Sequence, residues 1–211
     1  MKLNSVFILL FACVLSACSD QATKEHLHKK HSGMYMDHGT QQGQYYHDPK
    51  GNTFFYRHIT TTITNDSMVP LNLEIGFTTE YHYPAPFEEQ SFKLFLLPES
   101  LAGDQQDHEK VLRTFLDTAL EKPSALYKTI QPKQELNITI GILTNKNAFA
   151  PTQLALITKG HRPHFINHDS LISHKASTTN PLDLLFALDF NESDCPSCFS
   201  VIPCGKMTHS K

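Results

Sequence analysis

The sequence predicts a mainly β fold, a β-sandwich with one helix inserted at about residues 107–121. Stretches in which apolar and polar residues alternate recur along the 211 residues, and such alternation is typical of half-buried strands. The 14 Phe and 7 Tyr are compatible with a β-rich core. A single stretch has apolar residues at helical spacing. About seven short strands with one helix favour two packed sheets.

The predicted strands follow one another along most of the chain. The first, 54–64, is rich in aromatic and β-branched residues, and Asn65-Asp66-Ser67 after it is a turn signal. Residues 71–77 alternate clearly between apolar and polar, and an irregular aromatic loop is expected at 81–86. The remaining strands are predicted at 92–97, 136–142, 154–158 and 184–190.

One stretch between the predicted strands has the period of a helix. Its apolar residues are spaced three and four apart, Asp107 is placed to cap its start, and Pro123 marks its end. We therefore expect a helix at about 107–121. Its apolar positions are Val111, Leu112, Phe115, Leu116, Ala119 and Leu120.

Residues 1–17 have the features of a secretory signal peptide. Lys2 gives a positive start, and the apolar run 6–15 is shorter than the roughly 20 residues that a membrane-spanning helix needs. The run ends in Leu15-Ser16-Ala17-Cys18. This ending resembles the lipobox of bacterial lipoproteins, which consists of a branched residue, two small residues and a cysteine. An ordinary secreted protein that is cut near this point is the alternative.

The lipobox resemblance implies that Cys18 is the lipidated first residue of the mature protein. In that family the cysteine thiol receives a diacylglycerol, the peptide is cut before it, and the new amino group is usually acylated. Two or more acyl chains give stable anchoring in a membrane. Ser19 follows, and in enteric lipoproteins serine there implies passage to the outer membrane. The expected location is therefore the bacterial cell envelope, at the outer membrane, with the domain facing the periplasm or the cell surface.

Composition divides the rest of the chain into three parts. Residues 18–51 are polar, with many Lys, His, Gln and Gly and few aliphatic residues. They cannot bury enough apolar area to offset their ordering entropy, which predicts a flexible tether. The alternating stretches and the helix fall in 52–194, the predicted sandwich domain. Residues 195–211 are expected to form a cysteine-containing tail.

Two stretches of the predicted domain resemble the immunoglobulin-like modules of bacterial envelope proteins. FFYRHITTTITNDSMVPLNLEIGF joins two strands through an Asn-containing turn, and LYKTIQPKQELNITIGILT passes through a Pro-led turn into an alternating strand. The resemblance implies an immunoglobulin-like β-sandwich. It does not indicate an activity, because such sandwiches host many functions.

Histidines and methionines are concentrated in the predicted tether. HSGMYMDHG holds two of each, and imidazole and thioether groups are ligands for soft transition metals such as Cu(I). A hydrophilic tether that happens to contain histidine explains the same pattern. Histidines also recur in GHRPHFINHDSLISH, which has no helical period and is interpreted as a solvated loop. The candidate metal ligands of the tether are His26, His28, His31, Met34, Met36 and His38.

Three cysteines remain near the C-terminus when Cys13 leaves with the signal peptide and Cys18 carries lipid. In an oxidising compartment clustered thiols form disulfides. A bridge between the two nearest cysteines closes a very short loop and stabilises little, so we expect one bridge that includes the third. Alternatives are a zinc site that His209 completes, and thioredoxin-like chemistry, although no helix follows the C-x-x-C sequence. The disulfide candidates are Cys195, Cys198 and Cys204.

The remaining features narrow the classes of function. A net charge of −3 at pH 7 gives no basic field for nucleic acid. The sequence contains no nucleophile elbow, phosphate loop or dinucleotide fingerprint. We therefore expect no enzymatic activity and no cofactor, but a structural or accessory component of a larger envelope assembly. Its expected partners are the lipid bilayer, through Cys18, and other envelope proteins. A lipoprotein that handles copper or zinc is the alternative.

Overall fold

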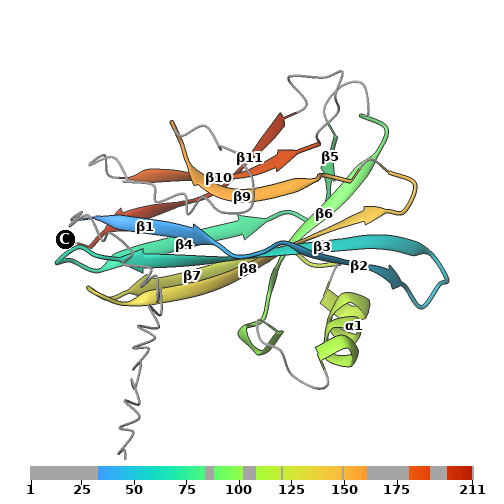
Figure 1. Ribbon diagram of the computed structural model, residues 1–211, viewed down its shortest axis with the longest axis horizontal. Coiled ribbons are helices and arrows are strands. Elements are labelled where there is room, and N and C mark those ends of the chain that lie inside the picture. Colours follow the sequence, from blue (N-terminus) through green and yellow to red (C-terminus); the bar gives the residue numbers. More distant parts are fainter. Residues whose placement is uncertain are drawn as a thin grey trace, which may run out of the picture. The chain divides into compact units, whose positions relative to one another are not determined.

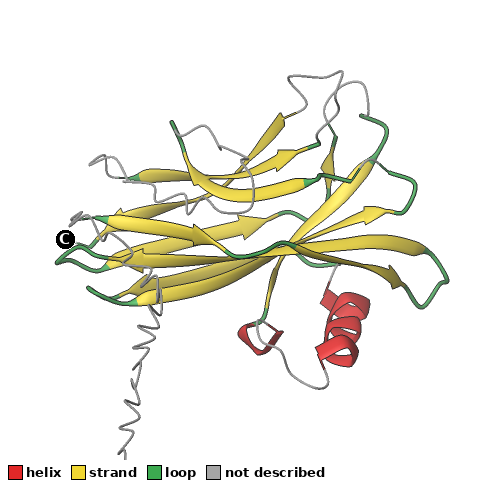
Figure 2. Ribbon diagram, in the orientation of Figure 1, coloured by secondary structure: helices red, strands yellow, loops and turns green. Residues whose placement is uncertain are grey.

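The chain folds into two antiparallel sheets that pack face to face (Figure 1), so the predicted β-sandwich is confirmed. Strands dominate, and the part of the chain that the structure describes has one α-helix (Figure 2). All described residues belong to one compact unit, His31–Lys211. The computed structural model describes residues 33–83, 88–101, 108–119, 121–148, 150–160, 181–190 and 199–210.

The first sheet has six strands. They are β1 (Met34–His38), β2 (Gln42–His47), β3 (Thr53–Asn65), β5 (Tyr81–His82), β6 (Ser91–Leu97) and β8 (Glu135–Asn145). Their order is β1-β3-β8-β6-β5, and β2 pairs with the first half of β3 while β1 pairs with its second half. The long pairing of β3 with β8, from Phe54 opposite Asn145 to Thr64 opposite Glu135, forms the centre of this sheet.

The second sheet has five strands. They are β4 (Leu71–Phe77), β7 (Ser124–Ile130), β9 (Gln153–Thr158), β10 (Leu182–Asp189) and β11 (Phe199–His209). Their order is β7-β4-β11-β10-β9, and every neighbouring pair is antiparallel. Strand β4 is therefore an interior strand, with β7 on one side and β11 on the other.

Alternating side chains of both sheets form the core between them. On β4 the residues at alternate positions are buried, as the sequence pattern predicts for a half-buried strand. Phe77 of β4 and Phe186 of β10 meet edge to face, with ring centroids 6.0 Å apart, which is a favourable arrangement of aromatic rings. The predicted strands at 71–77, 136–142, 154–158 and 184–190 are thus confirmed in β4, β8, β9 and β10.

A second apolar cluster lies on the outer face of the first sheet, where the helix packs. Leu112 and Leu116 of α1 (His108–Ala119) contact this cluster, close to the short helix η1 (Glu99–Leu101). Gly141 of β8 makes room for the sheet side of the cluster, since a Cβ atom there would lie 2.5 Å from the ring of Phe95. The predicted helix is confirmed, and it covers part of one outer face. The sheet contributes Tyr46, Tyr56, Phe95, Leu97 and Leu143.

Two tyrosines under the helix differ in how their hydroxyl groups are paired. The Tyr46 hydroxyl donates a hydrogen bond of 2.5 Å to Oδ1 of Asp117 on α1. Burial, followed by this hydrogen bond, raises the pKa of Tyr46 above its usual range. The Tyr56 side chain is only 1% exposed, and its hydroxyl has no hydrogen-bond partner among the described residues. Burial raises the pKa of Tyr56 as well.

This difference predicts opposite effects for two matched substitutions. Tyr46→Phe should lower the free energy of unfolding by about 1 kcal/mol, because a hydrogen bond to a partly solvated carboxylate is lost. Tyr56→Phe should leave it unchanged or raise it by up to about 1 kcal/mol, because an unpaired polar group is removed from the interior. Urea denaturation of both variants measures the difference. Equal destabilisation by the two substitutions would contradict the conclusion that the hydroxyl of Tyr46 is hydrogen-bonded and that of Tyr56 is not.

Strands β1 and β2 correct the predicted tether 18–51. Residues 34–47 contain both strands, and Met34 and Met36 are core residues. The polar composition misled the prediction because these short strands gain their order from pairing with β3, in which Met34 lies opposite Asn65 and His38 opposite Thr61. The predicted signal peptide, 1–17, and residues 18–32 lie outside the described residues.

Strand β11 corrects the predicted tail 195–211. Residues 199–207 pair with β10 on one side, and residues 205–209 pair with β4 on the other. Proline is unfavourable inside a sheet because it lacks an amide hydrogen. Pro203 is tolerated because it lies in the half of β11 that pairs with β10 but not with β4. The register with β10 shifts between Leu184 and Leu185, next to this position. Residues 191–198 lie outside the described part.

Among the described residues, no helix is long and apolar enough to cross a membrane.

Candidate functional site

The candidate site lies on the outer face of the second sheet, over strands β7, β4 and β11. Alternate residues of β4 point into the core, so Asn72 and Glu74 point outward. Pairing across the three strands places these two residues in the middle of two rows on the same face. The rows are Tyr127–Glu74–Lys206 and Thr129–Asn72–Thr208.

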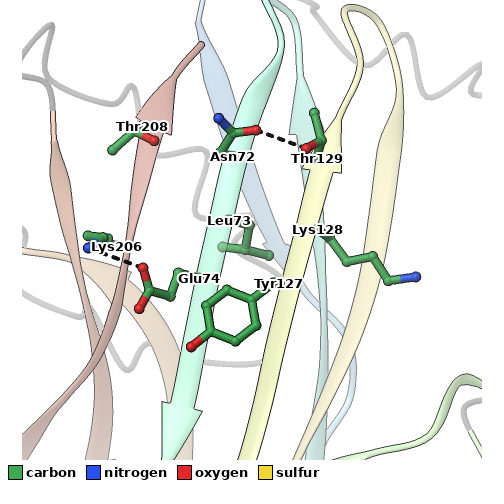
Figure 3. Close-up of a pocket in the computed structure, with 8 residues that line it drawn as sticks. All are labelled: Asn72, Leu73, Glu74, Tyr127, Lys128, Thr129, Lys206 and Thr208. Atoms are coloured by element: carbon green, nitrogen blue, oxygen red, sulfur yellow. Dashed lines mark hydrogen bonds and ion pairs between the residues drawn. The ribbon is translucent and has the colours of Figure 1, made fainter.

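The two rows line an open groove of about 280 Å³ (Figure 3). In this view the ring of Tyr127 extends from β7 across β4 and lies beside Glu74, while Asn72 and Thr129 lie toward the other end of the groove. The strands beneath are joined by continuous ladders on both sides of β4, so the floor is preformed. The lining residues are Asn72, Leu73, Glu74, Tyr127, Lys128, Thr129, Lys206 and Thr208.

The charges of the groove are paired. Nζ of Lys206 lies 3.1 Å from a carboxylate oxygen of Glu74. Lys128 points away from β4 (Figure 3), and its Nζ lies 3.5 Å from a carboxylate oxygen of Glu99. The four side chains of these pairs are 42% to 74% exposed, so each pair contributes little to folding stability. Their effect on the site is that both lysines have an acidic partner, Glu74 within the lining and Glu99 outside it.

Asn72 is held in one orientation by its neighbours. Its Oδ1 accepts a hydrogen bond of 2.8 Å from the Thr129 hydroxyl on β7. Its Nδ2 donates a hydrogen bond of 2.9 Å to the Ser210 hydroxyl, just after β11. Because an amide has two donor hydrogens and two acceptor lone pairs, Asn72 retains capacity for both kinds of hydrogen bond with a ligand. The amide is thus a fixed polar group in the floor of the groove.

Tyr127 is the large apolar residue of the groove, and 71% of its surface is exposed. A tyrosine ring presents a broad apolar face with few rotatable bonds, so little entropy is lost when a ligand packs on it. Aromatic residues are enriched at the centres of binding surfaces for this reason. A paired sheet with one exposed aromatic ring and several fixed polar groups has the composition that binding surfaces share.

Of the predicted metal ligands, the structure describes Met34, Met36 and His38. Met34 and Met36 are core residues of β1 and are not available to wrap an ion in a flexible segment. His38 lies at the end of the same strand, where its Nδ1 is 2.9 Å from the Thr61 hydroxyl oxygen. Within the described residues, no group of three or more His, Cys, Asp or Glu is placed to hold a metal ion. His26, His28 and His31 lie outside the described residues, as does the histidine group at 161–174.

The cysteines are described in part. Cys204 has a free thiol in this structure and is buried in the core, while the bridge expected through this residue stays a prediction. Burial raises the pKa of the Cys204 thiol to about 12, and a protonated thiol is a poor nucleophile. Strand β11 places this residue inside a sheet and not in a tail. Cys18, Cys195 and Cys198 lie outside the described residues.

The groove residues were not identified from the sequence. Strand β7 has a mostly exposed pattern without clean alternation, and β11 was assigned to the tail. The groove requires both strands beside β4, so its two walls were absent from the prediction. The one available signal was Tyr127 followed by the polar residues Lys128 and Thr129 in LYKT, which an exposed strand explains equally well.

No protein-family model matches the chain, and no curated protein or solved structure matches it either. The functional inference therefore rests on the geometry of the groove and on the sequence motifs.

Proposed function

We propose that this chain is a lipid-anchored component of a bacterial envelope that binds another envelope component without chemistry of its own. The observation that carries the proposal is the open groove over β7, β4 and β11, with Tyr127 exposed above a preformed floor. The groove combines an aromatic ring with fixed polar groups, which is the composition of a binding surface. Its charged residues are engaged in ion pairs.

The rigidity of the groove supports a role in binding. Strand β4 is paired along its length with β7 and over Leu71–Ile75 with β11. A preformed surface loses little conformational entropy when a partner binds, so more of the contact free energy appears as affinity. The outer face of the other sheet is in part covered by α1, whereas the groove is open.

The anchor is proposed from the Leu15-Ser16-Ala17-Cys18 motif. Each buried CH₂ group of an acyl chain contributes about 0.8 kcal/mol, and two or more chains hold a protein stably at a membrane. A tethered domain meets partners at a high local concentration, so a modest affinity at the groove suffices for occupancy.

Replacement of Cys18 tests the anchor. Cys18→Ala should move the protein from the detergent-extracted membrane fraction to the soluble fraction, or leave it unprocessed at its larger mass. Immunoblotting of fractionated cells measures both quantities. A variant that is processed to the mature size and stays in the membrane fraction would contradict the lipid anchor.

Site-specific photo-crosslinking tests the groove. A photoreactive phenylalanine in place of Tyr127 should form a specific crosslinked product in intact cells. The same replacement of Tyr45, which is 68% exposed on β2, is the matched control and should give no such product. Equal products at both positions, or none at position 127, would contradict a binding role for the groove.

A further inference from the structure

We propose that the ligand of the groove is a neutral carbohydrate chain, an inference that rests on the proposed binding function and specifies it. The groove offers an aromatic platform, hydroxyl and amide groups, and balanced charge (Figure 3). Sugars present an apolar C–H face and a rim of hydroxyl groups, which match the ring and the polar residues respectively.

The balance of charge favours an uncharged ligand. Along one row, Glu74 of β4 pairs with Lys206 of β11 at 3.1 Å. The adjacent strand continues the alternation, since Asp183 lies opposite Lys206 and pairs with Lys159 at 3.3 Å. A polyanion such as nucleic acid requires an excess of positive charge, and a basic peptide requires an excess of negative charge. The lining has two lysines and one glutamate, and Glu99 beside it pairs with the second lysine, so the groove with its ion-pair partners supplies neither excess.

An extended peptide is a poorer match for the groove, because the main-chain groups of β4 already form hydrogen bonds within the sheet. Peptides that bind to sheets gain affinity from main-chain hydrogen bonds at an open strand edge. The groove lies on the face of the sheet, where the main-chain groups of β4 are directed into the ladders with β7 and β11. Its floor therefore offers side chains, and a ligand with many hydroxyl groups is better matched to them than a peptide backbone.

The arrangement of side chains fits a sugar ring. Tyr127 extends across β4 at one end of the groove, and Asn72, Thr129 and Thr208 lie along the other row. A sugar packed on the tyrosine ring would direct its hydroxyl groups toward these residues and toward Glu74. The carboxylate and the amide accept and donate hydrogen bonds, as neighbouring hydroxyl groups require.

The volume of the groove indicates that it holds a short length of the carbohydrate. About 280 Å³ is near the lower limit of small-molecule sites, which measure about 300–1,000 Å³. The groove is open to solvent, so a longer chain can continue beyond it.

Ligand-observed NMR with three neutral tetrasaccharides tests the inference on the folded domain. Chitotetraose represents an N-acetylated, cell-wall-type backbone, and cellotetraose and maltotetraose represent glucan-type polysaccharides. We expect saturation transfer from the protein to at least one of the three. The pattern across the probes distinguishes the two sources of glycan.

Substitutions at the platform locate the binding. Tyr127→Ala should weaken binding about tenfold or more, because the stacking surface is removed. Tyr127→Phe should retain affinity to within about threefold, because the ring remains. Tyr45→Ala, at an equally exposed tyrosine outside the groove, should have no effect. Circular dichroism confirms that each variant is folded.

Two outcomes would overturn the carbohydrate inference. One is that no tetrasaccharide binds, and the other is that binding survives Tyr127→Ala. If no saccharide binds while crosslinking through position 127 still yields a specific protein product, the groove binds a protein, and the proposed function stands without its carbohydrate ligand. If saccharide binding and crosslinking both fail, the proposed function fails with it.

Discussion

Gly205→Ala is expected to disrupt the pairing of β11 with β4 in the second sheet. The free energy of unfolding should fall by more than about 4 kcal/mol. Gly205 lies on β11 opposite Ile75 of β4, where the two backbones approach closely. A Cβ atom at this position would lie 1.9 Å from the carbonyl oxygen of Glu74 and 3.0 Å from the Cα atom of Ile75. Both are backbone atoms, so no side-chain movement relieves the contact.

The backbone of Gly205 adds to this effect. Its φ of 157° lies at the limit of the region that favours glycine. The contact between the added Cβ atom and the backbone of β4 is relieved only when β11 moves away from β4. This movement breaks the hydrogen-bonded ladder in the interior of the sheet and displaces one wall of the groove. For a chain of this size a loss of about 4 kcal/mol lowers Tm by roughly 10 °C, which thermal denaturation followed by circular dichroism measures.

Gly76→Ala is the matched control for Gly205→Ala. Gly76 lies on the neighbouring strand β4, and a Cβ atom there would meet its nearest neighbour at 3.7 Å, an ordinary contact. This substitution should change the free energy of unfolding by less than about 1 kcal/mol. If the two variants unfold at similar temperatures, the close approach at Gly205 is not as described.

The fold class could be predicted because the burial of one face of each core strand produces a recognisable pattern of apolar and polar residues in the sequence. The strand Leu71–Phe77 has one side in the core and one in solvent, so its apolar and polar residues alternate. The same reasoning holds for Leu182–Asp189. The helix was identifiable because Leu112 and Leu116 repeat at helical spacing on the face that packs on the first sheet.

The strands that the sequence did not reveal take their structure from distant partners. Met34 and Met36 are separated by a tyrosine and followed by acidic and histidine residues, and their burial depends on pairing with β3, about 30 residues later. Strand β11 contains Pro203 and Gly205, both of which argue against a strand locally. Its place in the sheet follows from the neighbours that it finds in β4 and β10.

The groove was beyond prediction for a related reason. Its residues are ordinary polar side chains of three strands that are far apart in the sequence, and only their register brings Tyr127, Glu74 and Lys206 into one row. No motif marks such a row, because each strand contributes one or two residues. A site of this kind becomes visible when the order of strands in the sheet is known.

The turn after β3 shows that one polar residue can fix several elements at once. Asn65 is fully buried. Its Nδ2 donates hydrogen bonds of 2.9 Å to the carbonyl oxygens of Val69 and Ile130, and its Oδ1 accepts from the amide and hydroxyl groups of Ser67. These four bonds join the end of β3 to the turn before β4 and to the end of β7. The turn that Asn65-Asp66-Ser67 predicted is therefore confirmed, and its first residue also links the two sheets.

Asn65→Asp is expected to lower the free energy of unfolding by about 3–5 kcal/mol. The two side chains have the same shape, so packing is unchanged. The substitution replaces the Nδ2 donor with an oxygen that faces the carbonyl oxygens of Val69 and Ile130, which leaves both without their partner and introduces repulsion in a buried position. Asn137→Asp is the matched control, because Asn137 is exposed on β8 and its Oδ1 accepts from the Thr62 hydroxyl, as a carboxylate oxygen also does.

The loss in Asn65→Asp should depend on pH. Burial raises the pKa of the introduced carboxyl group above its unfolded value of about 3.9. Below that unfolded value the group is protonated in both states and retains one donor, so the destabilisation is smallest there. It grows as the pH rises through the unfolded pKa, because only the unfolded state then ionises freely. Urea denaturation at pH 4 and pH 8 should therefore give a larger loss at pH 8, relative to the wild type at the same pH. A loss that is equal at the two pH values, or that Asn137→Asp reproduces, would show that the two carbonyl oxygens of Val69 and Ile130 do not depend on Asn65 for their hydrogen bonds.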